Sequence, residues 1–307
     1  MSAEANAEHP LGGLKTEGVN PATVEIDRMS PLEIVQVMNT EDTHMVAAVR
    51  QELPHIARAI EEIAARLRQG GRLVYIGAGS SGRLGLLDAS ECPPTFNTPP
   101  DQVIGLIAGG IEATAQAFEN VEDDADTGQA DVARLAINEK DVVVGIAASG
   151  RTPYTLGAIT YAKERGALTI GVACNAATPL ENIAHIMIAP LVGPEVIAGS
   201  TRLKAGTAQK MVLNMLSTGA MIILSKTFGN LMVDVQATNY KLRERAIKIV
   251  QQATGLDHDA AASLLRAADD ETKTAIAANR LNVAPKVARE RLAAHGNILR
   301  TTLEAGQ

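Results

Sequence analysis

Three short segments combine glycine, hydroxyl side chains and a basic residue, a composition typical of loops that bind anions. They span residues 77–83 (GAGSSGR), 148–152 (ASGRT) and 199–206 (GSTRLKAG). The first two follow apolar runs and precede helical patterns, so their backbone N–H groups are expected at helix N-termini, where the helix dipole favours negative charge. One such loop is usually a simple capping turn, whereas three favour an anion site. The candidate binding residues are Gly79, Ser80, Ser81, Ser149, Gly150, Arg151, Ser200, Thr201 and Lys204.

The first of these loops also matches the pattern G-x-G-x-x-G of dinucleotide-binding proteins. That interpretation requires an acidic residue about 20 positions later, at the end of the second strand. The second apolar run, VIGLIA, ends in Gly109-Gly110, and Asp101 precedes this run instead of ending it. No Walker lysine follows the loop either. The sequence therefore predicts neither a dinucleotide nor a nucleoside triphosphate site.

Three glutamates near these loops are candidates for acid–base chemistry. Glu91 precedes Pro93 and Pro94, which are expected to end the helix opened by the first loop. A carboxylate at a helix C-terminus faces the negative end of the dipole, which favours its protonated form and suits a general acid. Glu122 lies in an acidic run, for which a solvated surface is the competing interpretation. Glu195 is the third candidate.

The remaining chemistry of the sequence is sparse. The six histidines and two cysteines show no metal-ligand spacing, so no metal site is expected. Two thiols in a chain of this size fit a reducing cytoplasm, and the N-terminus shows no apolar signal-peptide core. The apolar stretch 211–224 is too short to cross a bilayer and is interpreted as a buried core or dimer helix.

The order of the expected elements predicts an α/β fold. Five nearly continuous apolar runs lie at 72–77, 103–108, 141–147, 167–173 and 184–190, mostly with helical segments between them. This pattern is typical of a parallel sheet buried on both faces, whose ligands bind at the carboxyl ends of the strands. An arm at 1–30 and two helices, the first beginning at Ser30-Pro31, precede the sheet.

The domain prediction divides the chain into three continuous ranges. Residues 1–62 form the arm and N-terminal helices, 63–230 the sheet domain, and 250–307 a small domain of three or four helices. Asp257 is the expected N-cap of one of these helices. A net charge of −7 and only 2% aromatic residues argue against nucleic-acid binding.

Longer blocks of the sequence resemble a known family. GAGSSGRLGLLDASECPPTF, GIAASGRTPY and GSTRLKAGTAQKMVLNMLSTG are similar to signature blocks of the N-acetylmuramic acid 6-phosphate etherases, within the sugar isomerase (SIS) group. The resemblance covers nearly the whole chain. It implies a flavodoxin-like five-stranded parallel sheet and a lyase that splits the D-lactyl ether of N-acetylmuramic acid 6-phosphate in cell-wall sugar recycling, without a cofactor.

The same resemblance implies roles for particular residues. The two catalytic glutamates of the family fall on Glu91 and Glu122, with Glu119 one helical turn from the second. The serine-bearing loops take the phosphate, and the protein is a homodimer with its active site at the subunit interface. An unbroken helix would separate Ser81 from Glu91 by about 15 Å. Either this helix ends early, or each site draws Glu91 from one subunit and the phosphate loops from the other.

Two other functions remain open on the sequence. SIS proteins also serve as sugar-phosphate sensors, and a sensor needs the phosphate loops but not the pair of glutamates. An aldose–ketose phosphate isomerase would place its base at Glu195. Release of D-lactate from the muramic acid phosphate separates the etherase from both alternatives.

Overall fold

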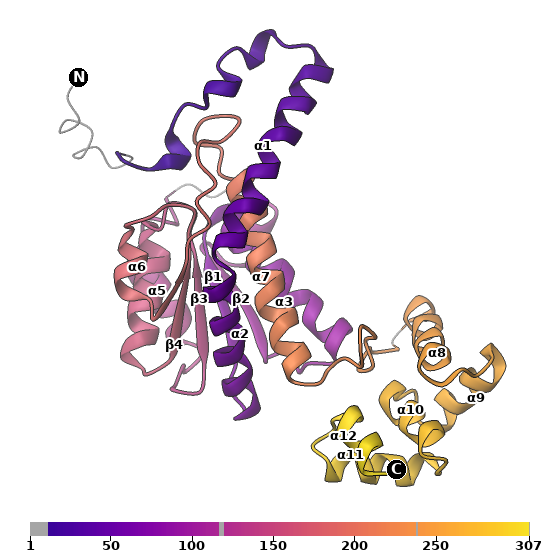
Figure 1. The fold of residues 1–307 in the computed structure, drawn as a ribbon. Helices are drawn as coiled ribbons and strands as arrows, with labels where there is room; N and C mark the ends of the chain where they lie inside the picture. Colours follow the sequence, from indigo (N-terminus) through magenta and orange to yellow (C-terminus); the bar gives the residue numbers. More distant parts are fainter. Residues whose placement is uncertain (1–11, 117–119, 238, 307) are drawn as a thin grey trace. The chain divides into compact units, whose positions relative to one another are not determined.

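The chain packs into two compact units in a computed structural model that describes residues 12–116, 120–237 and 239–306 (Figure 1). The sheet unit comprises residues up to 90 together with 101–217, and the C-terminal unit comprises 91–100 and the residues from 218 onward. The units interleave along the sequence because two helices, α3 (Gly79–Phe96) and α7 (Lys204–Ile223), run from one into the other. The expected domains were continuous ranges instead.

The sheet has five parallel strands, as predicted. They are β1 (Leu73–Gly77), β2 (Val103–Ile107), β3 (Val142–Ile146), β4 (Leu168–Val172) and β5 (Ile186–Ile188). Their order is β2-β1-β3-β4-β5, the flavodoxin-like arrangement. In register, Leu73 lies opposite Val103 of β2 and Val142 of β3. The predicted strands are therefore confirmed; the first four are one or two residues shorter than the predicted runs, and β5 is four residues shorter.

Alternate residues of β1 point to opposite faces of the sheet. Val74 and Ile76 pack with Tyr154 and Ile159 of α5 (Pro153–Glu164) on one face. On the other face the hydroxyl of Tyr75 donates to Asp88 of α3 at 2.8 Å. Helices thus cover both faces, which explains why β1 is buried at every position.

The other helices of the sheet unit are α1 (Pro31–Gln51), α2 (Leu53–Arg68), α4 (Ala125–Ala133) and α6 (Pro179–Ile183). The predicted start of α1 is confirmed, because Ser30 and Glu33 form a reciprocal capping box. Residues 1–11 of the expected arm lie outside the described range. The rest of the arm forms short 3₁₀ turns, η2 (Lys15–Glu17), η3 (Pro21–Thr23) and η4 (Ile26–Arg28); a fourth, η5 (Ile111–Thr114), follows β2.

The expectation that Pro93 and Pro94 end the helix of the first loop is wrong. Both prolines lie inside α3, which continues to Phe96. Proline has a helical φ angle, and the bonds that it cannot donate fall in the last turns of this helix. The chain leaves the helix at Asn97, whose φ of 51° is left-handed and whose N–H donates to the carbonyl of Pro93 at 2.9 Å.

The C-terminal unit contains five helices after residue 239, one or two more than predicted. They are α8 (Tyr240–Thr254), α9 (His258–Ala267), α10 (Thr272–Arg280), α11 (Pro285–Ala294) and α12 (Leu299–Ala305). The predicted N-cap is confirmed, since Asp257 accepts the N–H of Ala260. The sequence did not predict the break between α9 and α10. It lies at Asp269 and Asp270, two successive left-handed residues without a nearby glycine or proline to signal them.

Candidate functional site

The first glycine loop joins β1 to α3 at the carboxyl edge of the sheet. Gly79 has a left-handed φ of 52°. The adjoining Ser81 is only 9% exposed, and its hydroxyl donates to Oε1 of Gln209 at 2.9 Å. Gln209 is itself buried, and its Nε2 has no partner among the described residues. The hydroxyl proton of Ser81 is therefore held by a protein acceptor. Its neighbour Ser80 is half-buried and lines a groove between α3 and the start of α7.

The second loop follows β3 and has a fixed shape. The Oγ of Ser149 accepts the N–H of Arg151 at 3.1 Å, and the guanidinium of Arg151 reaches the carbonyl of Gly12 at 3.3 Å. Gly150 has a φ of 66°, and a Cβ there would lie 2.5 Å from the Cβ of Thr178. Only glycine fits both the angle and the space.

The third loop differs from the other two, because the protein supplies an anion for its helix. Ser200 and Thr201 precede α7, whose first N–H groups, on Lys204 and Ala205, each donate to the carboxylate of Glu195 at 2.9 Å. Glu195 is fully buried, and this burial raises its pKa despite the two hydrogen bonds. The first N–H groups of α7 are therefore occupied by Glu195.

Lys204 was expected to bind substrate, but the structure gives it a different place. Its side chain is 2% exposed, and its ammonium lies 2.7 Å from Oε2 of Glu41, which also accepts from the amide of Asn20 at 2.7 Å. Burial opposes ionisation of Glu41, yet these hydrogen bonds outweigh it and the pKa of Glu41 is lowered. The pair joins α1 to the start of α7, so we exclude Lys204 from the substrate-binding residues.

Glu122 lies next to the second loop. Its backbone carbonyl accepts the N–H of Tyr154, in the first turn of α5, at 3.0 Å. The Glu122 side chain is exposed. The acidic run is thus fixed to the helix that begins just after Ser149 and Gly150. Glu119, the alternative to Glu122, lies outside the described residues.

Glu91 is exposed and lies on α3. Because this helix continues to Phe96, Glu91 is not at its C-terminus, and the argument from the helix dipole does not apply. The uninterrupted helix separates Ser81 from Glu91 by about 15 Å along its axis. The alternative in which the helix ends before Glu91 is thereby removed.

A cationic groove adjoins the first loop, between α3 and the start of α7. We call it the α3–α7 groove, a cavity of about 440 Å³ lined by Ser80, Arg83, Leu84, Leu87, Arg202, Gly206, Thr207 and Lys210. It contains three cations and no carboxylate among these described residues. Sequence reasoning did not select Arg83, Arg202 or Lys210 as site residues. Arg83 and Arg202 lie within the first and third loop segments, and this position is the signal by which the sequence could have identified them.

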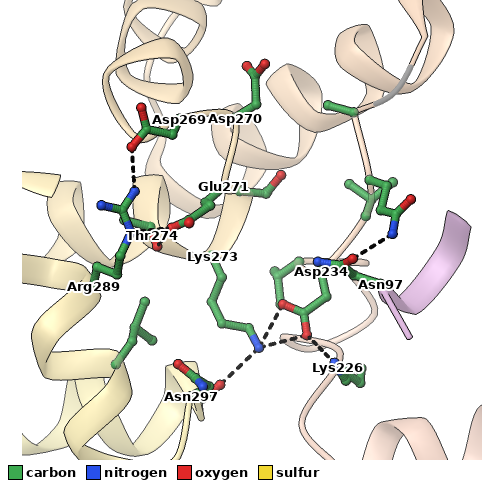
Figure 2. A pocket seen from close by; sticks show the side chains of 16 residues that line it. Asn97, Lys226, Asp234, Asp269, Asp270, Glu271, Lys273, Thr274, Arg289 and Asn297 are labelled. Atoms are coloured by element: carbon green, nitrogen blue, oxygen red, sulfur yellow. Dashed lines mark hydrogen bonds and ion pairs between the residues drawn. The ribbon is translucent and has the colours of Figure 1, made fainter. Parts of the chain in front are cut away.

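A second cavity, of about 550 Å³, lies within the C-terminal unit (Figure 2). In this C-terminal pocket, Arg289 bridges Asp269 and Glu271, at 2.8 Å in each case. Lys273 lies 2.9 Å from Asp234 and also donates to the carbonyl of Asn297 at 3.0 Å. Figure 2 shows Lys273 reaching across toward Asp234 and Asn297. Each of the three cations of the C-terminal pocket, Lys226, Lys273 and Arg289, pairs with a carboxylate that also lines it.

The described residues form neither a cluster of metal ligands nor a membrane-spanning helix. No group of three or more His, Cys, Asp or Glu side chains in this part of the chain is placed to hold a metal ion. None of the described helices is both long and apolar enough to traverse a lipid bilayer.

Three family models match the chain. Residues 55–163 match the N-terminal SIS domain of glucokinase regulatory protein, residues 114–219 the SIS domain, and residues 229–295 the C-terminal lid domain of glucokinase regulatory protein. Two solved structures share the fold. A phosphoheptose isomerase from Francisella tularensis has a TM-score of 0.50 at 20% identity, covering 63% of this chain and 100% of its own. A putative phosphosugar isomerase from Bacteroides fragilis has a TM-score of 0.52 at 18% identity, covering 69% and 100%.

Curated relatives match over almost the full length. The N-acetylmuramic acid 6-phosphate etherase 2 of Vibrio parahaemolyticus is 54% identical, covering 95% of this chain and 98% of its own. The N-acetylmuramic acid 6-phosphate etherases of Rhodopirellula baltica and Pectobacterium atrosepticum are each 52% identical, covering 92% and 96% of this chain, and 93% and 98% of their own. This agreement in sequence and fold confirms the resemblance, and the chain belongs to the N-acetylmuramic acid 6-phosphate etherase family.

Proposed function

We propose that this protein is a carbon–oxygen lyase that cleaves the D-lactyl ether of N-acetylmuramic acid 6-phosphate. Its products are N-acetylglucosamine 6-phosphate and D-lactate, and its place is cytoplasmic recycling of cell-wall sugars. The family supports this assignment. The structural observation that carries it is the hydrogen bond from the backbone N–H of Tyr154 to the backbone carbonyl of Glu122, because it places a residue with an exposed carboxylate beside a glycine–serine loop at the carboxyl edge of the sheet.

The phosphate group of the substrate is assigned to the glycine and serine loops. Backbone N–H groups and hydroxyls are neutral donors that suit a phosphate dianion at the carboxyl edge of a parallel sheet. The proposed binding residues are Gly79, Ser80, Ser81, Ser149, Gly150, Arg151, Ser200 and Thr201. Ser81 contributes its backbone N–H, because its hydroxyl proton is donated to Gln209. Ser200 and Thr201 contribute hydroxyls alone, because Glu195 takes the first N–H groups of α7.

The reaction proceeds by elimination and then addition of water. In the open-chain sugar, the C1 aldehyde acidifies the C2 proton, and Glu122 removes it as the base. Glu91 protonates the C3 ether oxygen as the C3–O bond breaks and lactate leaves. Water then adds to the unsaturated aldehyde: the Glu91 carboxylate takes a proton from the water as its oxygen bonds to C3, and protonated Glu122 returns a proton to C2. The steps require one acid and one base at each stage.

The separation along α3 supports an active site shared between two subunits. A phosphosugar is too short to extend from Ser81 to a carboxylate about 15 Å along the same helix. We propose a homodimer in which Glu91 of the partner subunit completes the site formed by the loops. The α1 helix offers exposed apolar side chains for such an interface, among them Leu32 and Val35. Light scattering should give the mass of a dimer, and a fully active monomer would refute this assembly.

The assignment of the two glutamates is tested by separating the two halves of the reaction. Glu91→Gln should abolish D-lactate release but retain exchange of the C2 proton of N-acetylglucosamine 6-phosphate with deuterium from heavy water. Glu122→Gln should lose both activities, because removal of the C2 proton precedes every other step. Lactate is assayed directly, and NMR of the sugar in heavy water measures the exchange.

Glu112→Gln is the matched control, since Glu112 is an exposed carboxylate on the neighbouring η5 turn and should keep both activities. If Glu91→Gln loses exchange while Glu122→Gln keeps it, the two roles are reversed. Binding of the sugar phosphate without lactate release by the unmodified protein would indicate a sensor. A ketose product would indicate an isomerase, although Glu195 is buried and caps α7.

A further inference from the structure

The α3–α7 groove concentrates positive charge on a chain whose net charge is −7. Arg83, Arg202 and Lys210 all line this cavity, and none of its described lining residues is acidic. Three like charges around one cavity repel each other, so an anion that entered it would gain favourable interactions. The groove begins at Ser80, which we assign to the phosphate site.

Two of the three cations have no ion-pair partner among the residues that the structure describes. The guanidinium of Arg83 donates to the carbonyls of Ala113 and Gln116, at 3.1 and 3.0 Å. Arg202 and Lys210 are exposed, and neither forms an ion pair within the described part of the chain. The carboxylate whose pKa responds to Lys210 is Asp88.

Asp88 is not available to neutralise the groove. It is 6% exposed, and it accepts hydrogen bonds from Tyr75 and from two residues of α7, Asn214 at 2.7 Å and Ser217 at 3.1 Å. Its position and partners are therefore fixed on the inner side of α3. The charges of Arg202 and Lys210 remain free for a ligand.

The groove also has an apolar wall. Leu84 and Leu87 line it from α3, and Leu87 is 53% exposed. A phosphate group offers nothing to such a wall, whereas a lactyl group carries both a carboxylate and a methyl group. The cations and the leucines together match these two substituents. The sugar phosphate product has no lactyl group, so it presents no carboxylate, and its methyl group is that of the N-acetyl substituent at C2.

We propose that Arg202 and Lys210 bind the lactyl carboxylate of the substrate, with its methyl group against Leu84 and Leu87. This inference rests on the proposed etherase function and adds residues that determine specificity. Arg202 and Lys210 distinguish the muramic acid phosphate from its product by a second anion, while the loops bind the phosphate that both molecules share.

The test compares ligands with and without the lactyl group. The double variant Arg202→Gln/Lys210→Gln should lower kcat/KM for D-lactate release by about 10- to 100-fold, the effect of losing a charge-assisted hydrogen bond. Most of this loss should appear in KM. Affinity for N-acetylglucosamine 6-phosphate by calorimetry, and its C2 exchange in heavy water, should remain unchanged. Arg58→Gln, which removes an exposed cation of α2, is the control and should change nothing.

A modified substrate gives a second readout. A muramic acid phosphate with a carboxamide in place of the lactyl carboxylate should be a poor substrate of the unmodified protein. The double variant should convert this carboxamide with the same kcat/KM as the unmodified protein. Equal loss of affinity for substrate and product would assign the groove to the phosphate and overturn the proposal. An unchanged kcat/KM of the double variant, in an enzyme that releases lactate, would also overturn the proposal. So would a change in the mass of the assembled oligomer of the double variant, because it would make the groove an interface between subunits. If the unmodified protein releases no lactate, the proposed function itself fails.

Discussion

The C-terminal pocket and the α3–α7 groove each contain three cationic side chains, but they use these charges in opposite ways. Lys226, Lys273 and Arg289 line the pocket together with four carboxylates. The groove has Arg83, Arg202 and Lys210 and no carboxylate among its described residues. The first set of charges is balanced within the protein, whereas the second is not. A cation near a cavity therefore indicates a ligand only after its protein partners have been counted.

The difference has an energetic basis. Lys273 is 8% exposed, and a buried ammonium without a partner would cost several kcal/mol in desolvation. Asp234 and two backbone carbonyls, those of Ser225 and Asn297, offset that cost. Lys210 is exposed and needs no such partner. It keeps its charge at little cost to stability and can contribute that charge to binding.

The largest expected effect of this contrast is on stability. Lys273→Met should lower the free energy of unfolding by about 3 kcal/mol, because Asp234 loses its closest cationic partner in a mostly buried position. Lys210→Met, the same substitution in the groove, should change it by less than about 0.5 kcal/mol. Urea denaturation followed by circular dichroism measures both. Equal losses in the two variants would show that the groove lysine is structural as well, and would remove the contrast.

Most of the sheet could be predicted because its signals are local. Each strand is a short apolar run buried on both faces, and each of the first two loops follows directly from a strand end. The Ser30–Glu33 capping box and the Asp257 cap are likewise contained within four residues. Local composition therefore located the elements and the two loops at the carboxyl edge.

The status of individual charges could not be predicted in the same way. Lys204 and Arg202 stand two positions apart in one loop segment, yet Lys204 is buried against Glu41, which is 163 residues away in the sequence. Arg202 lines the groove. Only the folded chain shows which of the two is neutralised. The same reasoning applies to Glu195, whose partners are backbone N–H groups that no residue pattern distinguishes.

A smaller effect should follow from giving the groove the carboxylate that it lacks. Thr207 is exposed, lines the groove and lies in the first turn of α7. Thr207→Glu places a negative charge near a helix N-terminus, which is favourable, so stability should not fall. The same charge lies on the surface that carries Arg202 and Lys210. It therefore competes with the lactyl carboxylate for these two cations.

The affinity of Thr207→Glu for the muramic acid phosphate, measured by calorimetry with a variant that also carries Glu91→Gln to prevent turnover, should fall by about tenfold. Thr207→Gln in the same background is the control for size and for the lost hydrogen bond from Thr207 to the carbonyl of Leu203, and it should bind as tightly as the background. The affinity for N-acetylglucosamine 6-phosphate should fall less, because that molecule presents no carboxylate to the groove. If both ligands lose affinity equally, the new charge acts on the phosphate instead, and the groove then resembles the C-terminal pocket in contributing nothing to recognition of the lactyl group.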